Sequence, residues 1–269
     1  MQRIKPLFFI SFLFLFINSV QSDMKKNTVL VCYGKMKPEL VKNYKYIILE
    51  SKHYLPSNIR VLKSQNEKVF AYISLGEVNK NAPHYSILKN NTLGKNKIWD
   101  SYYLDLNSKK TIEILMILVD ELFAKGYDGL FLDNFDNFTI HGPQKEQKAA
   151  IVNLLKMIKE KYPNKSFIQN AGLDLIAETT NYVDAIAIES IATDYSFKQK
   201  KYSLREKSQY ETLMNRLQSI HTTYNEPILL IEYANTSLLA KQVEDRIKYT
   251  DFEYFIGNID LQSIPNFIH

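Results

Sequence analysis

The chain has 269 residues, of which 45% are hydrophobic and 23% charged, and its formal net charge is +5 at pH 7. This length is ample for one large core, and a single α/β barrel commonly occupies it. The positive charge is not gathered into a Lys/Arg cluster interleaved with aromatic residues, so no nucleic-acid partner is expected. The one cysteine, Cys32, rules out an intramolecular disulfide.

Residues 1–22 have the layout of a secretory signal peptide. Arg3 and Lys5 precede an almost unbroken apolar run, Leu7–Ile17, and small and polar residues follow it. We therefore expect a secreted or periplasmic protein of residues 23–269, with no stable membrane association after cleavage. The alternative is a retained membrane anchor, although the apolar run is short for a membrane span.

After this segment, apolar runs of strand length alternate with segments of helical periodicity. The expected strands are residues 28–34, 46–50, 69–75, 129–132, 166–169, 185–188, 228–231 and 254–256. The expected helices are residues 108–125, 144–162, 203–222 and 237–249. This alternation favours parallel strands with right-handed crossovers, and eight strands favour closure into a single (β/α)8 TIM barrel. No G-x-G-x-x-G follows the first strand, which argues against a dinucleotide-binding fold.

The connection after the third expected strand, about residues 78–106, is unusually long. It has the character of a loop, but it contains Trp99, Tyr102 and Tyr103. A loop of this length inside a compact domain is often functional. Its aromatic residues could provide stacking surfaces for sugar rings, or they could belong to the core.

The most informative stretch is Gly126–Asp136, a short buried strand that opens into Asp133, Asn134 and Asp136. A carboxylate at that place costs several kcal/mol to desolvate unless something solvates or pairs it. In an α/β barrel, catalytic groups lie at this C-terminal end of the strands. The alternative is that Asp133 caps the next helix or pairs with a buried lysine.

Polar residues fall just beyond the other expected strands as well. The set is Tyr33, Glu50, Glu77, Asp133, Asn134, Asp136, Asn170, Glu189, Glu232, Tyr233 and Asn258. Each alone could be a cap or a structural hydrogen-bond partner, but together they predict one acid-rich cleft at the C-terminal face. Asp133 and Glu189, on the fourth and sixth strands, are the best-placed pair for glycosidic cleavage. One carboxyl would protonate the leaving oxygen, and the other would attack the anomeric carbon or activate water.

Other chemistries are less well supported by the sequence. Asp133, Asp136 and Glu189 could hold Mg²⁺ or Ca²⁺ instead. The five histidines show no H-x-x-x-H or H-x-H spacing, which disfavours zinc, and the absence of G-x-S-x-G disfavours a serine hydrolase. We expect no metal and no cofactor.

Three segments resemble the glycoside hydrolase family 114 barrels, the endo-α-1,4-polygalactosaminidase-like proteins. They are Phe70–Glu77, Gly126–Asp136 and Ala185–Ser190, with Gln169–Gly172 between the last two. The resemblance implies an endo-acting hydrolase of α-1,4-linked galactosamine or N-acetylgalactosamine polymers. It also implies that Asp133 is the nucleophile and Glu189 the general acid/base.

An amino-sugar polysaccharide is therefore the expected partner, and surplus acids would suit its ammonium groups. The residues expected to bind it are Tyr33, Glu50, Lys52, Glu77, Asn134, Asp136, Asn170, Glu232 and Tyr233. Lys52 departs from the family pattern, and it could pair with Glu50 or contact the substrate. Two alternatives stay open: a carbohydrate-binding barrel without turnover, and a metal-dependent hydrolase that uses the same acids. The sequence does not indicate an oligomeric state.

Overall fold

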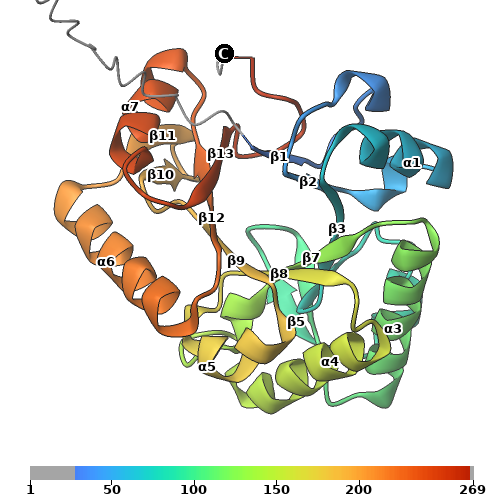
Figure 1. Ribbon diagram of the computed structural model, residues 1–269. Helices are drawn as coiled ribbons and strands as arrows, with labels where there is room; N and C mark the ends of the chain where they lie inside the picture. Colours follow the sequence, from blue (N-terminus) through green and yellow to red (C-terminus); the bar gives the residue numbers. More distant parts are fainter. Residues whose placement is uncertain (1–27, 267–269) are drawn as a thin grey trace, which may run out of the picture.

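The computed structural model describes residues 28–266, so the expected signal segment lies outside the described part. Eight parallel strands form one sheet, in the order β1-β2-β3-β7-β8-β9-β12-β13 (Figure 1). They are β1 (Val29–Cys32), β2 (Tyr46–Leu49), β3 (Lys68–Ser74), β7 (Gly129–Asp133), β8 (Ser166–Asn170), β9 (Ala185–Glu189), β12 (Ile228–Tyr233) and β13 (Glu253–Gly257). The predicted (β/α)8 barrel is confirmed, with each expected strand found within two residues of its bounds at either end.

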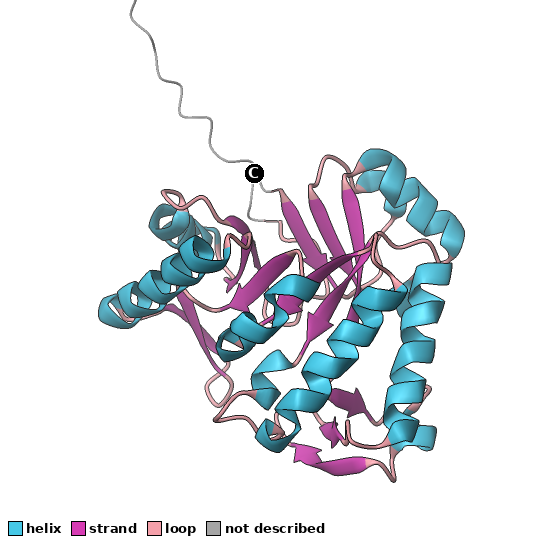
Figure 2. Cartoon of the chain, turned by 60° about the horizontal axis from the view of Figure 1, so that its bottom comes forward, coloured by secondary structure: helices cyan, strands magenta, loops and turns pink. Residues whose placement is uncertain are grey.

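Helices lie between the barrel strands and cover their outer face (Figures 1 and 2). The longer ones are α1 (Pro56–Gln65), α3 (Lys109–Ala124), α4 (Lys148–Lys161), α6 (Lys207–Tyr224) and α7 (Ser237–Ile247), and the short ones are α2 (Tyr85–Leu88) and α5 (Ile176–Thr179). Single turns of 3₁₀ helix are η1 (Pro38–Leu40), η2 (Ser51–His53), η3 (Phe135–Phe138), η4 (Lys145–Gln147), η5 (Leu173–Leu175) and η6 (Thr180–Tyr182). In α3, for example, the Ser108 hydroxyl accepts the Thr111 N–H, and Leu115 and Val119 recur on the buried face.

The barrel is nearly closed, because within residues 28–266 no strand ladder joins β1 to β13. Polar contacts seal this seam instead. The Tyr33 N–H donates to the Leu261 carbonyl at 2.6 Å, and Lys45 Nζ lies 2.8 Å from the Glu253 carboxylate. Gly34 has no space for a side chain, because a Cβ there would lie 1.9 Å from the Gln262 carbonyl oxygen. The segment after β13 therefore packs directly against the end of β1.

Two insertions at the C-terminal end of the barrel differ from the sequence expectation. The segment expected to be a loop at residues 78–106 contains an antiparallel sheet of β4 (Glu77–Asn79), β6 (Ser101–Leu104) and β5 (Thr92–Asn96), which lies at the bottom of Figure 2. The second insertion is a hairpin of β10 (Thr193–Ser196) and β11 (Lys201–Leu204). The helix expected from residue 203 begins at Lys207, because residues 203 and 204 pair within the hairpin and Glu206 caps α6.

Candidate active site

The amide of Asn170 holds the two predicted catalytic acids together at the C-terminal end of the barrel. Its Nδ2 donates one hydrogen bond to Asp133 Oδ1 and another to Glu189 Oε1, both at 2.8 Å. Two oxygens at that distance from one nitrogen are at most about 5.6 Å apart. Asp133 ends β7, Asn170 ends β8 and Glu189 ends β9, so three neighbouring strands place the three groups.

Asp133 accepts two further hydrogen bonds. The Tyr72 hydroxyl donates to Oδ2 at 2.8 Å, and the Asn134 N–H donates to Oδ1 at 2.8 Å. Asn134 has a left-handed backbone, with φ of 72°, which turns the chain sharply after the strand. Despite these donors, poor solvation raises the pKa of Asp133, and the charge of Glu77 contributes to the rise.

Glu189 accepts a hydrogen bond from the Tyr233 hydroxyl, and Tyr233 lies on β12. Tyr233 is buried, whereas water reaches Glu189. Protein atoms nevertheless surround the Glu189 carboxylate, and the resulting loss of solvation raises its pKa, as does the charge of Asp133. A carboxyl group with a raised pKa holds its proton closer to neutral pH, as a general acid must.

Two tyrosine rings lie beside these acids. The ring centroids of Tyr33 and Tyr72 are 4.8 Å apart. Loss of solvation and the charges of Asp133 and Glu189 raise the pKa of Tyr33 well above its usual value, so its hydroxyl stays neutral. Tyr72 is not among the site residues predicted from the sequence. The available signal was strand alternation, since Tyr72 lies two residues before Ser74, which pairs in register with Asp133.

Glu77 is buried, and its carboxylate is hydrogen-bonded to other side chains of the protein. It accepts hydrogen bonds from Asn96 Nδ2 at 3.1 Å, from Asn137 Nδ2 at 2.9 Å and from the Ser101 hydroxyl. These contacts tie the β4–β6 sheet to η3, the turn that follows Asp133. The expectation that Glu77 contacts substrate therefore does not fit its position, because its oxygens hold the insertion in place.

Glu232 also occupies a different place from the one expected. It is 0% exposed, and its carboxylate accepts the N–H groups of Ile191, Ala192 and Thr193 at 2.8 to 2.9 Å. Burial raises its pKa to about 7. Ile231 pairs in register with Glu189, so alternation points Glu232 to the opposite face of the sheet. Glu232 therefore holds the segment that follows Glu189 and does not face a substrate.

Three predicted site residues lie nearer to solvent. Lys52 Nζ is 3.9 Å from Glu50 Oε2, and the two side chains are 68% and 28% exposed, so they form a loose ion pair of the kind that adds little stability. Asp136 is exposed on η3, and its pKa is raised by the surrounding protein and by the charge of Asp133. The Asn134 side-chain oxygen, by contrast, is bonded to the Ser74 hydroxyl.

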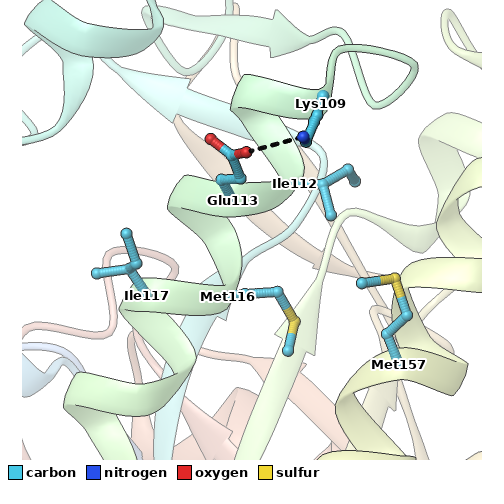
Figure 3. A pocket seen from close by; sticks show the side chains of 6 residues that line it. All are labelled: Lys109, Ile112, Glu113, Met116, Ile117 and Met157. Atoms are coloured by element: carbon cyan, nitrogen blue, oxygen red, sulfur yellow. Dashed lines mark ion pairs between the residues drawn. The ribbon is translucent and has the colours of Figure 1, made fainter.

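A separate apolar pocket of about 460 Å³ lies between α3 and α4, on the helix layer (Figure 3). It is lined by Lys109, Ile112, Glu113, Met116, Ile117 and Met157. These residues have no polar groups converging on the pocket apart from the Lys109–Glu113 pair, at 3.8 Å. The pocket therefore does not compete with the barrel end as the candidate active site.

Within residues 28–266, no group of three or more His, Cys, Asp or Glu side chains is arranged to hold a metal ion. None of the helices in the same residues is long and apolar enough to cross a membrane.

The sequence and the fold are both similar to those of known proteins. The model of the glycoside-hydrolase family GH114 matches residues 24–266. No curated protein matches the sequence. Among solved structures, the glycoside hydrolase domain of PelA from Pseudomonas aeruginosa is 24% identical with a TM-score of 0.78, over 88% of this chain and 96% of that one.

Two further structures share the fold at lower identity. Ega3 from Aspergillus fumigatus, solved in complex with galactosamine, is 19% identical with a TM-score of 0.68, over 88% of this chain and 92% of that one. An α-galactosidase from Thermus thermophilus, solved with p-nitrophenyl α-D-galactopyranoside, is 10% identical with a TM-score of 0.54. That alignment covers 91% of this chain and 59% of the α-galactosidase.

Proposed function

The chain belongs to glycoside-hydrolase family GH114, and we propose that it cleaves internal α-1,4 linkages of a galactosamine or N-acetylgalactosamine polysaccharide with retention of configuration. It is a glycoside hydrolase by this membership. The observation that carries the proposed mechanism is the sharing of Asn170 Nδ2 by Asp133 and Glu189. Retaining enzymes hold their two carboxyl groups about 5–5.5 Å apart, whereas inverting enzymes leave about 6.5–9.5 Å for a water molecule.

Asp133 is the proposed nucleophile. Donors from Tyr72, Asn170 and the Asn134 backbone fix its oxygens and favour the ionised form that attack requires. One Asp133 oxygen bonds to the anomeric carbon as the bond from that carbon to the glycosidic oxygen breaks. The product of this step is a covalent glycosyl-enzyme ester, and the glycosidic oxygen leaves with its electron pair.

Glu189 is the proposed acid/base. In the first step it gives its proton to the departing glycosidic oxygen and becomes ionised. In the second step it takes a proton from water, whose oxygen attacks the anomeric carbon and displaces Asp133. Asp133 is ionised before the first step, and Glu189 is ionised after it. The Asn170 amide, which donates to both carboxylates, can stabilise the negative charge on each of them.

The polar surroundings support an amino-sugar substrate. Asp136 and Glu50 carry accessible carboxylates that suit an ammonium group. The galactosamine bound in the Ega3 structure supports the same sugar class. Secretion is proposed from residues 1–22 alone.

The test is incubation of residues 23–269 with α-1,4-galactosaminoglycan, with and without EDTA, and sizing of the products by mass spectrometry. Asp133→Asn and Glu189→Gln run alongside, with Glu113→Gln on α3 as a matched control. We expect oligosaccharides from the wild type and the control, unaffected by EDTA, and none from the two site variants. Polymer binding without products would favour the carbohydrate-binding alternative, and loss of products with EDTA would favour the metal-dependent one.

A further inference from the structure

Two aromatic side chains from separate insertions meet at the end of the barrel that holds the catalytic acids. Trp99 lies in the turn between β5 and β6, and Phe197 lies in the turn between β10 and β11. Their ring centroids are 5.3 Å apart and their planes are at 88°, an edge-to-face contact. Trp99 is nevertheless 55% exposed and Phe197 48% exposed. The pair therefore presents open aromatic surface to solvent.

The position of this contact follows from the strand order. The insertion with Trp99 leaves the barrel after β3, and the hairpin with Phe197 leaves it after β9. Between β3 and β9 in the sheet lie β7 and β8, which carry Asp133 and Asn170. The β5–β6 turn with Trp99 and the β10–β11 turn with Phe197, here called the two tips, therefore meet from either side of β7 and β8.

Both tips are fixed relative to the catalytic residues. The Arg205 guanidinium, at the base of the hairpin, donates to the carbonyl of Ser190 at 2.8 Å, and Ser190 directly follows Glu189. Within the hairpin, Tyr195 packs against Phe197 with ring centroids 5.0 Å apart. On the other side, Glu77 ties the β4–β6 sheet to η3 next to Asp133. Trp99 and Phe197 therefore lie on insertions that are anchored to the segments beside Asp133 and Glu189.

The charge around the tips differs from the charge around the catalytic acids. Four lysines lie on the two turns or beside them, and none forms an ion pair within residues 28–266: Lys97, Lys198, Lys200 and Lys201. The acid on the first turn, Asp100, is already paired with Lys80 and Lys95. An ammonium group is therefore disfavoured there, while an uncharged sugar ring can stack on the aromatic surface.

We propose that Trp99 and Phe197 form a distal subsite that binds an N-acetylated amino-sugar ring of the polymer. This inference rests on the proposed function, because it assigns a second section of the same substrate. The accessible carboxylates of Asp136 and Glu50 suit the ammonium group of a deacetylated ring, and the two tips with their lysines suit an acetylated ring. The enzyme would then select stretches of polymer in which both forms occur.

Fluorescence provides a direct test, because Trp99 is the single tryptophan of the chain. The Glu189→Gln protein, which is expected not to turn over substrate, is titrated with an N-acetylated α-1,4-galactosamine oligosaccharide and with its deacetylated counterpart. We expect the acetylated ligand to change Trp99 emission saturably and at lower concentration than the deacetylated one. Adding Phe197→Ala should weaken its binding about two- to tenfold, as for loss of one aromatic contact. Tyr249→Ala, which removes an aromatic residue that is 86% exposed outside the site, should leave binding unchanged.

Calorimetry of the same titrations gives the total binding. Unchanged Trp99 emission at saturation, no binding of the acetylated ligand, or equal or tighter binding of the deacetylated ligand would overturn the subsite. Hydrolysis by the wild type is measured separately. Cleavage of the polymer together with unchanged Trp99 emission would support the proposed function and contradict the subsite. A change in Trp99 emission that depends on Phe197, without cleavage of the polymer by the wild type, would support the subsite and contradict the proposed function.

Discussion

Asp133 and Glu189 sit within about 5.6 Å of each other, measured between the oxygens that share the Asn170 amide. A shared donor fixes both the distance and the relative orientation of two carboxylates from different strands. It also reduces the repulsion between them when both are ionised, since each retains a hydrogen bond to the same partial positive charge.

Asn170→Ala should therefore reduce kcat about 10- to 100-fold, the effect of releasing both acids from their positions. KM should change little if the amide acts mainly in the transition state. Steady-state kinetics would show this split. The matched control is Asn153→Ala, an exposed asparagine on α4, which should keep wild-type kinetics. Near-normal kcat in Asn170→Ala would contradict the role of the shared amide.

Tyr233→Phe should move the basic limb of the pH profile of kcat/KM to higher pH. The Tyr233 hydroxyl lowers the pKa of Glu189 by bonding to its ionised form, so its loss raises that pKa further. A general acid with a higher pKa stays protonated at higher pH. An unmoved basic limb, with the fold intact by circular dichroism, would remove Glu189 from the general-acid role.

Tyr72→Phe should move the acidic limb of the pH profile of kcat/KM to higher pH. The Tyr72 hydroxyl favours ionised Asp133, so its loss raises the pKa of Asp133. The nucleophile would then ionise only at higher pH, and the acidic limb of kcat/KM should shift upward. The two tyrosine variants serve as controls for each other. Identical shifts in both would show that Asp133 and Glu189 do not have separate roles.

Glu232→Ala should lower the free energy of unfolding by about 1–3 kcal/mol, because it leaves the buried backbone donors of residues 191–193 without an acceptor. The pH dependence has a defined sign. The pKa of Glu232 is about 7 in the folded protein against an ordinary 4.5, so the folded state binds this proton more tightly. Its contribution to wild-type stability is present below pH 4.5 and is lost as pH rises through about 7.

Urea unfolding of both proteins across that range checks the prediction for Glu232. The difference between wild type and Glu232→Ala should shrink as the pH rises from about 4.5 to about 7. A difference that stays constant would show that Glu232 has an ordinary pKa in the folded protein.

The barrel and the placement of Asp133 beside Glu189 could be predicted because the relevant signals are local. Strands buried on both faces show continuous apolar runs, and Asp133 and Glu189 fall directly at the ends of two such runs. The family resemblance points to the same two acids. Asn170 could be found in the same way, as the polar end of β8.

The remaining features depend on contacts that sequence patterns do not encode. β5 reads as a loop because its five residues include Gly94 and largely exposed side chains, and only its partner β6 orders it. Glu232 resembles Glu189 in sequence, since both follow an apolar run. The register of β9 with β12 sends the two side chains to opposite faces. That register is set by tertiary pairing, so one acid joins the site and the other holds a loop.

The most direct test of the mechanism is the anomeric configuration of the first product released from α-1,4-galactosaminoglycan, followed by proton NMR before mutarotation. Two displacements through Asp133 predict the α-anomer from the wild type, and no product from Asp133→Asn. Initial release of the β-anomer would show a single displacement by water, and it would contradict the assignment of Asp133 and Glu189 as a retaining pair.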